Sequence, residues 1–183
     1  VGLERVDRLQ ADYGLEIEGK PFLLRPDTPK EGKPRPLRPG ESPDELSEPL
    51  RTQAEQAGLV MRRPSIIPYT RYALEATEYA GEQGKFYPFH LGLYRAYWKD
   101  GKDLGNLEVI REVADDCDLD WPELRHALES GRYQEPVMTQ YREAMELGIR
   151  GIPAFLIGEY LFTGARPYEV FRAVVGKVLK PDS

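Results

Sequence analysis

The longest regular pattern in this sequence is helical and occupies its middle. From Ser42 to residue 148, apolar residues recur every three or four positions, with charged residues between them. This spacing places the apolar side chains on one face of each of several successive helices. We expect these helices at residues 42–57, 69–83, 85–99, 106–117, 121–130 and 134–147. A block of this length can form an all-helical domain, which we assign to residues 42–148.

The residues before this block have a different character. Residues 1–11 have helical spacing, and residues 15–24 alternate in part, which predicts a strand. Residues 25–43 follow and contain six prolines, too many for a helix or a central strand. We expect a long surface loop here, with an arm that covers a site or a partner as the alternative.

The residues after the block predict a β-hairpin and a helix. Two short apolar runs, residues 152–157 and 160–162, are separated by Gly158-Glu159, which can turn. Pro167 suits the first position of the final helix. The chain is therefore expected to be α/β in three parts, residues 1–41, 42–148 and 149–183.

Composition excludes several classes of function. The formal net charge is -6, which argues against nucleic acid and anionic membrane surfaces as main partners. Charged residues make up 31% of the chain and no run of 18 apolar residues occurs, so no transmembrane helix is expected. One cysteine cannot form a disulfide within the chain.

Few residues outside the end segment suggest chemistry. Cys117 follows Asp115-Asp116, whose carboxylates disfavour a thiolate, so we interpret it as a core or boundary residue. His90 and His126 stand apart and have no zinc-ligand spacing, so no metal site is expected. The aromatic residues from Phe86 onwards fit helix packing better than a binding groove.

The most informative segment is Gly-Ile-Arg-Gly-Ile-Pro-Ala-Phe-Leu-Ile-Gly, residues 148–158. It places Pro153 at the entry of a strand, where a missing N–H is tolerated. From frequency alone, the Ile152–Pro153 bond would be trans, since about 5–6% of X-Pro bonds in folded proteins are cis.

This segment and the one after the hairpin carry a family resemblance. Gly-Ile-Arg-Gly-Ile-Pro-Ala-Phe, followed by Phe-Thr-Gly-Ala-Arg-Pro-Tyr-Glu-Val-Phe at residues 162–171, resembles the C-terminal signature of DsbA-family proteins, above all the FrnE-like branch. The Arg-Ala-Tyr-Trp segment at residues 95–98 is similar to a helical segment of that family. The resemblance implies a thioredoxin-like fold with an all-helical insertion domain. It also implies that the Ile152–Pro153 bond is cis and that Gly151, Ile152 and Pro153 bind the substrate.

The same resemblance implies thiol–disulfide exchange. In the family, a strand leads to Cys-x-x-Cys at the start of a helix, where backbone N–H groups stabilise a thiolate. Val1-Gly2-Leu3 resembles the residues that follow this motif. No catalytic residue is therefore visible in the chain, and we expect the reactive cysteines upstream of Val1.

Two alternatives remain open. The first is a glutathione-dependent enzyme of the 2-hydroxychromene-2-carboxylate isomerase or kappa transferase type, which shares the fold and replaces the cysteine pair with a serine-type site. Such enzymes usually carry a Trp-Gly-x-Asp-Arg-like segment after the hairpin, whereas this chain has Thr-Gly-Ala-Arg-Pro at residues 163–167. The second is a redox-inactive relative that binds peptides or a protein partner.

The remaining expectations follow from the preferred interpretation. Partners are protein or peptide thiols and disulfides, without nucleic acid or membrane, and a homodimer is left open. No cofactor is expected, apart from glutathione under the first alternative. The family branch places the protein in the cytoplasm.

Overall fold

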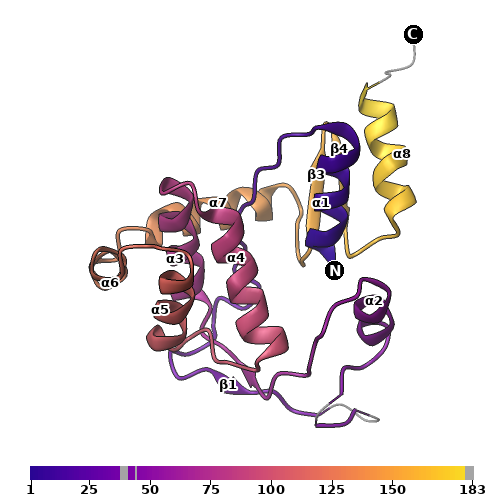
Figure 1. Ribbon diagram of the computed structural model, residues 1–183. Coiled ribbons are helices and arrows are strands. Elements are labelled where there is room, and N and C mark those ends of the chain that lie inside the picture. Colours follow the sequence, from indigo (N-terminus) through magenta and orange to yellow (C-terminus); the bar gives the residue numbers. More distant parts are fainter. Residues whose placement is uncertain (38–40, 44, 180–183) are drawn as a thin grey trace. The chain divides into compact units, whose positions relative to one another are not determined.

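A computed structural model describes residues 1–37, 41–43 and 45–179 and divides the chain into two compact units. The terminal unit combines Val1–Lys20 with Ala144–Ser183, and the helical unit is Pro21–Glu143 (Figure 1). The element order is a first helix, a largely helical block, a hairpin and a final helix.

The terminal unit is a β-hairpin packed on two helices. Strand β3, Ala154–Ile157, pairs antiparallel with β4, Tyr160–Thr163, so that Phe155 faces Phe162 and Leu156 faces Leu161. Helix α1, Gly2–Tyr13, and helix α8, Tyr168–Leu179, lie beside this hairpin (Figure 1). Because side chains alternate along a strand, Phe155 and Phe162 share one face, which joins the core with both helices.

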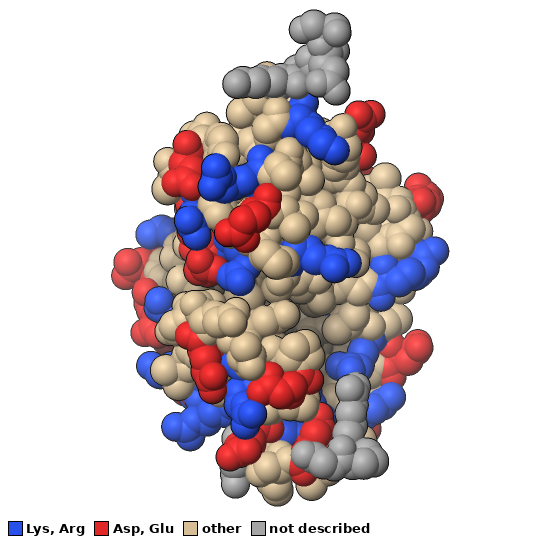
Figure 2. All heavy atoms as spheres, turned by 90° about the vertical axis from the view of Figure 1, so that its right-hand side faces the viewer, with Lys and Arg blue, Asp and Glu red and all other residues tan. Residues whose placement is uncertain are grey.

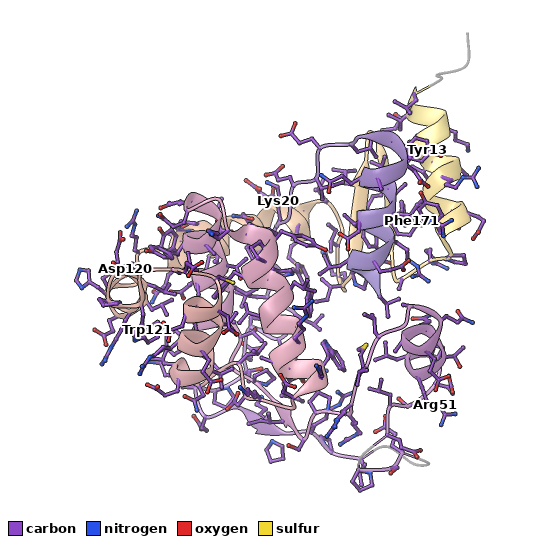
Figure 3. All side chains as sticks on the ribbon, viewed as in Figure 1. Tyr13, Lys20, Arg51, Asp120, Trp121 and Phe171 are labelled. Carbon is purple, nitrogen blue, oxygen red and sulfur yellow. The ribbon has the colours of Figure 1, made fainter. Side chains whose placement is uncertain are left out.

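Three phenylalanines form the centre of that core. The ring of Phe171, on α8, lies 4.7 Å from that of Phe155 and 5.0 Å from that of Phe162, both edge to face. Phe171, labelled in Figure 3, is fully buried. Edge-to-face aromatic pairs are favourable beyond their burial, so this cluster fixes α8 on the hairpin.

A hydrogen bond and a cation–π contact join α1 to α8 at the edge of this core. The Tyr168 hydroxyl donates to Asp12, and the Arg8 guanidinium lies 4.0 Å from the centre of the Tyr168 ring. Burial, followed by the Asp12 carboxylate, raises the pKa of Tyr168 to about 12. The hydroxyl therefore remains a donor at physiological pH.

The core of the helical unit is formed by successive helices. These are α3 (Arg71–Glu82), α4 (Phe86–Tyr94), a π-helical turn (Arg95–Lys99), α5 (Leu107–Asp116), α6 (Trp121–Ser130) and α7 (Gln134–Glu146). Their shared core contains Ala76, Tyr79, Phe89, Ile110 and Leu124. Helix α7 runs across the boundary between the two units.

Two helix starts agree with their capping residues. The Asn106 side chain accepts a hydrogen bond from the Glu108 N–H at the start of α5, and Asp120 accepts one from the Glu123 N–H at the start of α6. Asp120 and Trp121 stand at that start (Figure 3). Such caps satisfy N–H groups that the first helical turn leaves free. The helices predicted for residues 106–117 and 121–130 are both confirmed.

Two predicted elements differ from the structure. Residues 15–24 form no strand, because no described segment pairs with them through ladder hydrogen bonds. The helix predicted for residues 42–57 is reduced to α2, Leu50–Gln56; residue 44 lies outside the described residues. Pro49 explains the late start, since the residue before a proline disfavours helical geometry.

The proline-rich segment packs on the helical unit. Strand β1, Lys33–Pro34, pairs with β2, Ile66–Ile67, and the buried Arg63 guanidinium donates to the carbonyls of Arg35 and Pro36 at 2.9 and 2.8 Å. These bonds fix the segment to residues far along the chain. The boundary between the units therefore lies at residues 20/21 instead of the expected 41/42, and the second lies at 143/144 instead of 148/149.

The phenylalanine cluster predicts a large effect for one substitution. Phe171→Ala removes a fully buried ring, and it should lower the free energy of unfolding by about 3–5 kcal/mol. The matched control is Val170→Ala, because Val170 is the preceding residue on α8 and is 38% exposed. Urea unfolding measures both variants; equal midpoints for the two would contradict the assigned core.

Candidate functional site

The loop formed by Gly151, Ile152 and Pro153 links α7 to β3 in the terminal unit. The Ile152–Pro153 peptide bond is cis, and the Ile152 side chain is 47% exposed. Before the loop, the Arg150 guanidinium donates to the carbonyls of Met145 and Ile149 at 2.7 and 3.1 Å. A cation bonded to terminal carbonyls stabilises the end of a helix, so Arg150 fixes one side of the loop to α7.

The other side of the loop is held by the residues after β4. The Gly164 N–H donates to the Pro153 carbonyl at 2.8 Å. The Arg166 Nε donates to the Thr163 carbonyl, and the Arg5 Nε donates to the Arg166 carbonyl, both at 3.0 Å. Together these bonds connect Pro153, the end of β4 and α1.

The start of α1 lies directly against Pro153. A Cβ added at Gly2 would stand 3.3 Å from Cβ and Cγ of Pro153 and from Cζ of Phe155. A Cβ at this distance would be tighter than most real contacts, so glycine suits this close approach of the helix to the proline. The helix dipole favours negative charge at the start of α1, so the geometry suits an anion beside Pro153.

Ile152 presents free backbone groups next to this helix end. Neither its N–H nor its carbonyl has a hydrogen-bond partner among the described residues. An exposed apolar side chain between free backbone groups suits an extended peptide, because the backbone can pair while the side chain is covered. Gly151, Ile152 and Pro153, the residues predicted to bind the substrate, therefore lie together beside the start of α1.

Cys117 is a buried residue at the end of α5 and belongs to the helical core. Burial, followed by the carboxylate of Asp116, raises the pKa of its thiol. The predicted direction of the shift is confirmed, although burial contributes more than the neighbouring charge. A protonated, covered thiol is a poor nucleophile.

The two histidines have different surroundings. His126 is exposed on α6, whereas His90, on α4, lies between the rings of Phe86 and Tyr94 at centroid distances of 5.4 and 4.7 Å. The buried His90 Nδ1 has no partner among the described residues, and burial lowers the pKa of this imidazole to about 4. His90 is therefore neutral at physiological pH and packs as an aromatic residue.

Glu75 is a buried carboxyl that the sequence pattern did not single out. It is 2% exposed on α3, and its Oε2 has no hydrogen-bond partner among the described residues. Burial raises its pKa to about 7, and the charge of Arg71, one turn earlier, opposes this shift. The sequence does contain a signal for a buried Glu75, because this residue lies between Tyr72 and Tyr79, on the apolar face of the helix.

Charge and metal chemistry add no further site to the described part of the chain. Within it, no group of three or more His, Cys, Asp or Glu side chains could hold a metal ion. On the face shown in Figure 2, acidic and basic side chains are interspersed. None of the described helices combines the length and apolar character needed to cross a bilayer.

The contact of Gly2 with Pro153 predicts a steric effect. Gly2→Val adds methyl groups where a Cβ is already tight, so it should destabilise the fold by about 1–3 kcal/mol. Gly176→Val is the control, because a Cβ added at Gly176 on α8 meets nothing within 4 Å. Urea unfolding should separate the two; a Gly2→Val protein as stable as the control would show that α1 does not contact the loop.

Glu75 predicts a pH-dependent difference. Its folded pKa lies above its unfolded value, so its contribution is fully present below about pH 4.5 and is lost as pH rises towards about 7. Glu75→Gln imitates the neutral carboxyl, so its stability relative to wild type should increase between pH 5 and pH 8. His90 contributes to stability with the opposite pH dependence, but it does so equally in both proteins, so it cancels in the difference between their free energies of unfolding. Glu108→Gln, at an exposed residue, is the control. A difference that is constant with pH would contradict a buried, protonated Glu75.

Comparisons with known proteins agree with this arrangement. The family model described as DSBA-like thioredoxin domain matches residues 1–176. Protein YwbO of Bacillus subtilis is 26% identical over 164 residues, which cover 88% of this chain and 81% of the relative.

Solved structures show the same fold. A probable DsbA oxidoreductase from Streptomyces coelicolor has a TM-score of 0.84 at 24% identity and covers all of this chain and 85% of its own. A 2-hydroxychromene-2-carboxylate isomerase has a TM-score of 0.73 at 16% identity, and the match covers 97% of this chain and 88% of the isomerase. A putative protein disulfide isomerase from Nitrosomonas europaea has a TM-score of 0.65 at 15% identity, and the match covers 100% of this chain and 92% of that protein. The expected thioredoxin-like fold with a helical insertion is confirmed, and the chain belongs to the family of DSBA-like thioredoxin domains.

Proposed function

We propose that this protein catalyses thiol–disulfide exchange on peptide or protein disulfides. In this proposal, a Cys-x-x-Cys segment precedes Val1, and Gly151, Ile152 and Pro153 bind the substrate. The observation that carries the proposal is the contact of Gly2 with Pro153, because it places the start of α1 beside the loop. A cysteine just before that helix would stand next to a substrate bound on Ile152.

The helix start beside the loop supports the first step of such an exchange. The N–H groups at the start of α1 stabilise the first cysteine as a thiolate. This thiolate attacks one sulfur of the substrate disulfide and forms a mixed disulfide, while the other substrate sulfur leaves as a thiolate and takes up a proton. The second cysteine then attacks the mixed disulfide and releases the reduced substrate, leaving the enzyme disulfide.

The substrate position follows from the loop. An extended peptide pairs with the free N–H and carbonyl of Ile152 and covers its exposed side chain. The bond from the Gly164 N–H to the Pro153 carbonyl and the bonds of Arg150 hold this loop in place during the exchange. A fixed loop lowers the entropy that is lost when the reacting sulfurs are aligned.

A glutathione-dependent reaction is the second candidate. It is favoured by the fold shared with 2-hydroxychromene-2-carboxylate isomerase. The two candidates differ in the nucleophile that precedes Val1, a cysteine pair for exchange and a serine for the glutathione enzyme. We place the protein in the cytoplasm in either case, with protein or peptide disulfides as partners and no resident cofactor for the exchange reaction.

Substitution of Ile152 tests the proposed site. Ile152→Asp should lower kcat/KM for a peptide disulfide about five- to tenfold, since covering the exposed half of an isoleucine contributes about 1–1.5 kcal/mol. Thermal stability should change little. The measurement follows a single turnover, the reduction of a self-quenched peptide disulfide by an excess of the pre-reduced protein with its natural N-terminus, and the second-order rate constant takes the place of kcat/KM. Alkylation with iodoacetamide should abolish the reaction.

The control is Leu179→Asp, which introduces the same charge at a residue that is 58% exposed at the far end of α8. Equal rates for wild type, Ile152→Asp and Leu179→Asp would remove Ile152 from the substrate site. A protein that reduces no disulfide but turns over a substrate only with added glutathione would favour the second candidate.

A further inference from the structure

Arg166 is a cation without a carboxylate partner beside the candidate site. It is exposed, and no ion pair joins it to a described residue. Some exposed arginines of the helical unit, such as Arg51 and Arg125, are paired with a carboxylate of a described residue, whereas others, such as Arg62 and Arg95, are not. In the terminal unit, each of the other arginines is engaged elsewhere: Arg5 pairs with Glu4, Arg8 lies over the Tyr168 ring, Arg150 is bonded to carbonyls and Arg172 is bonded to Tyr13.

The guanidinium of Arg166 is fixed close to the loop. Its Nε donates to the Thr163 carbonyl, and Thr163 stands directly opposite Ala154, the residue after Pro153, in the hairpin. The Gly164 N–H, two residues before Arg166, is bonded to the Pro153 carbonyl. The hydrogen bond to Thr163 uses only Nε, so the two Nη groups have no hydrogen-bond partner among the described residues.

We propose that Arg166 selects substrates that carry a carboxylate next to the reacting disulfide. This inference rests on the proposed function and adds its substrate class. A peptide that lies along Ile152 extends past Pro153, where an acidic side chain near its cysteine reaches the Nη groups of Arg166. A guanidinium with free Nη groups binds a carboxylate through charge-assisted hydrogen bonds.

The surrounding charges agree with this role. Arg166 lies just before the first turn of α8, which favours negative charge. Glu169 in that turn is the nearest acidic residue in sequence, and no ion pair joins it to Arg166. An extended acidic peptide therefore meets a guanidinium without an acidic partner among the described residues, close to the start of a helix.

The test compares two peptide disulfides that differ in one residue, Glu or Gln next to the cysteine. With the natural full-length protein, the Glu peptide should have a kcat/KM about three- to fivefold higher, the size expected for a partly exposed charge pair. In Arg166→Gln, the ratio of the two kcat/KM values should fall to about one, because loss of the Nε bond to Thr163 affects both peptides alike and only the Glu peptide loses a charge partner. Arg166→Lys should restore part of the preference, and 0.5 M salt should weaken it in wild type.

Lys177→Gln is the matched control, because it removes one positive charge from the same unit, near the end of α8. It should keep the preference for Glu. Glutathione disulfide, whose carboxylates are also near its sulfurs, is the third substrate. A kcat/KM for glutathione disulfide that exceeds that of the Glu peptide and falls in Arg166→Gln would identify a small disulfide, and not a peptide, as the source of the carboxylate.

Binding distinguishes failure of this inference from failure of the proposed function. Serine-for-cysteine versions of the two peptides are titrated into wild type and Arg166→Gln, with circular dichroism to confirm that the variant is folded. A Glu preference that disappears in Arg166→Gln supports the carboxylate site even where no disulfide is reduced. Equal binding of both peptides to wild type, or a preference that survives in Arg166→Gln, overturns the inference.

Discussion

The packing of Phe171 between Phe155 and Phe162 is the interaction on which the terminal unit depends. It holds α8 on the hairpin, and α1 joins the same core through Leu9. The contact between Gly2 and Pro153, which are about 150 residues apart in sequence, exists only because this core brings the two chain ends together. The candidate site is therefore a product of tertiary packing, since neither end contains it alone.

The helical unit shows how a long insertion remains stable between those ends. It has its own apolar core, and Arg63 fixes the proline-rich segment to it. The same core covers Glu75 and His90, two titratable groups whose buried nitrogen or oxygen has no partner among the described residues. Both are held neutral by burial, so their effects on stability oppose each other as pH changes.

Sequence patterns predicted most helices because their signals are local. Asn106 and the residues around Trp121 mark two helix starts, and Gly158 marks the hairpin turn. The strand predicted for residues 15–24 failed because strands depend on a neighbour, which an alternating pattern does not supply. The helix predicted from Ser42 failed because Pro49 delays its start.

The site was less accessible to the same methods. Periodicity places Pro153 at a strand entry, and only the family resemblance assigned a substrate role to Gly151 and Ile152. The role of Gly2 depends on a contact across most of the chain, so no local pattern contains it. Arg166 has an ordinary sequence context, and its relevance comes from the bond that fixes its guanidinium beside the loop while both Nη groups have no partner among the described residues.

Thiol–disulfide exchange requires a nucleophile at the start of α1, and its presence can be measured directly. Intact mass and N-terminal sequencing of the protein from its natural source, followed by the pH dependence of alkylation, test this requirement. We expect Cys-x-x-Cys immediately before Val1, with the pKa of the first thiol well below the ordinary value of about 8.5. A natural chain that begins near Val1, or a serine in place of the first cysteine, would contradict thiol catalysis by this protein.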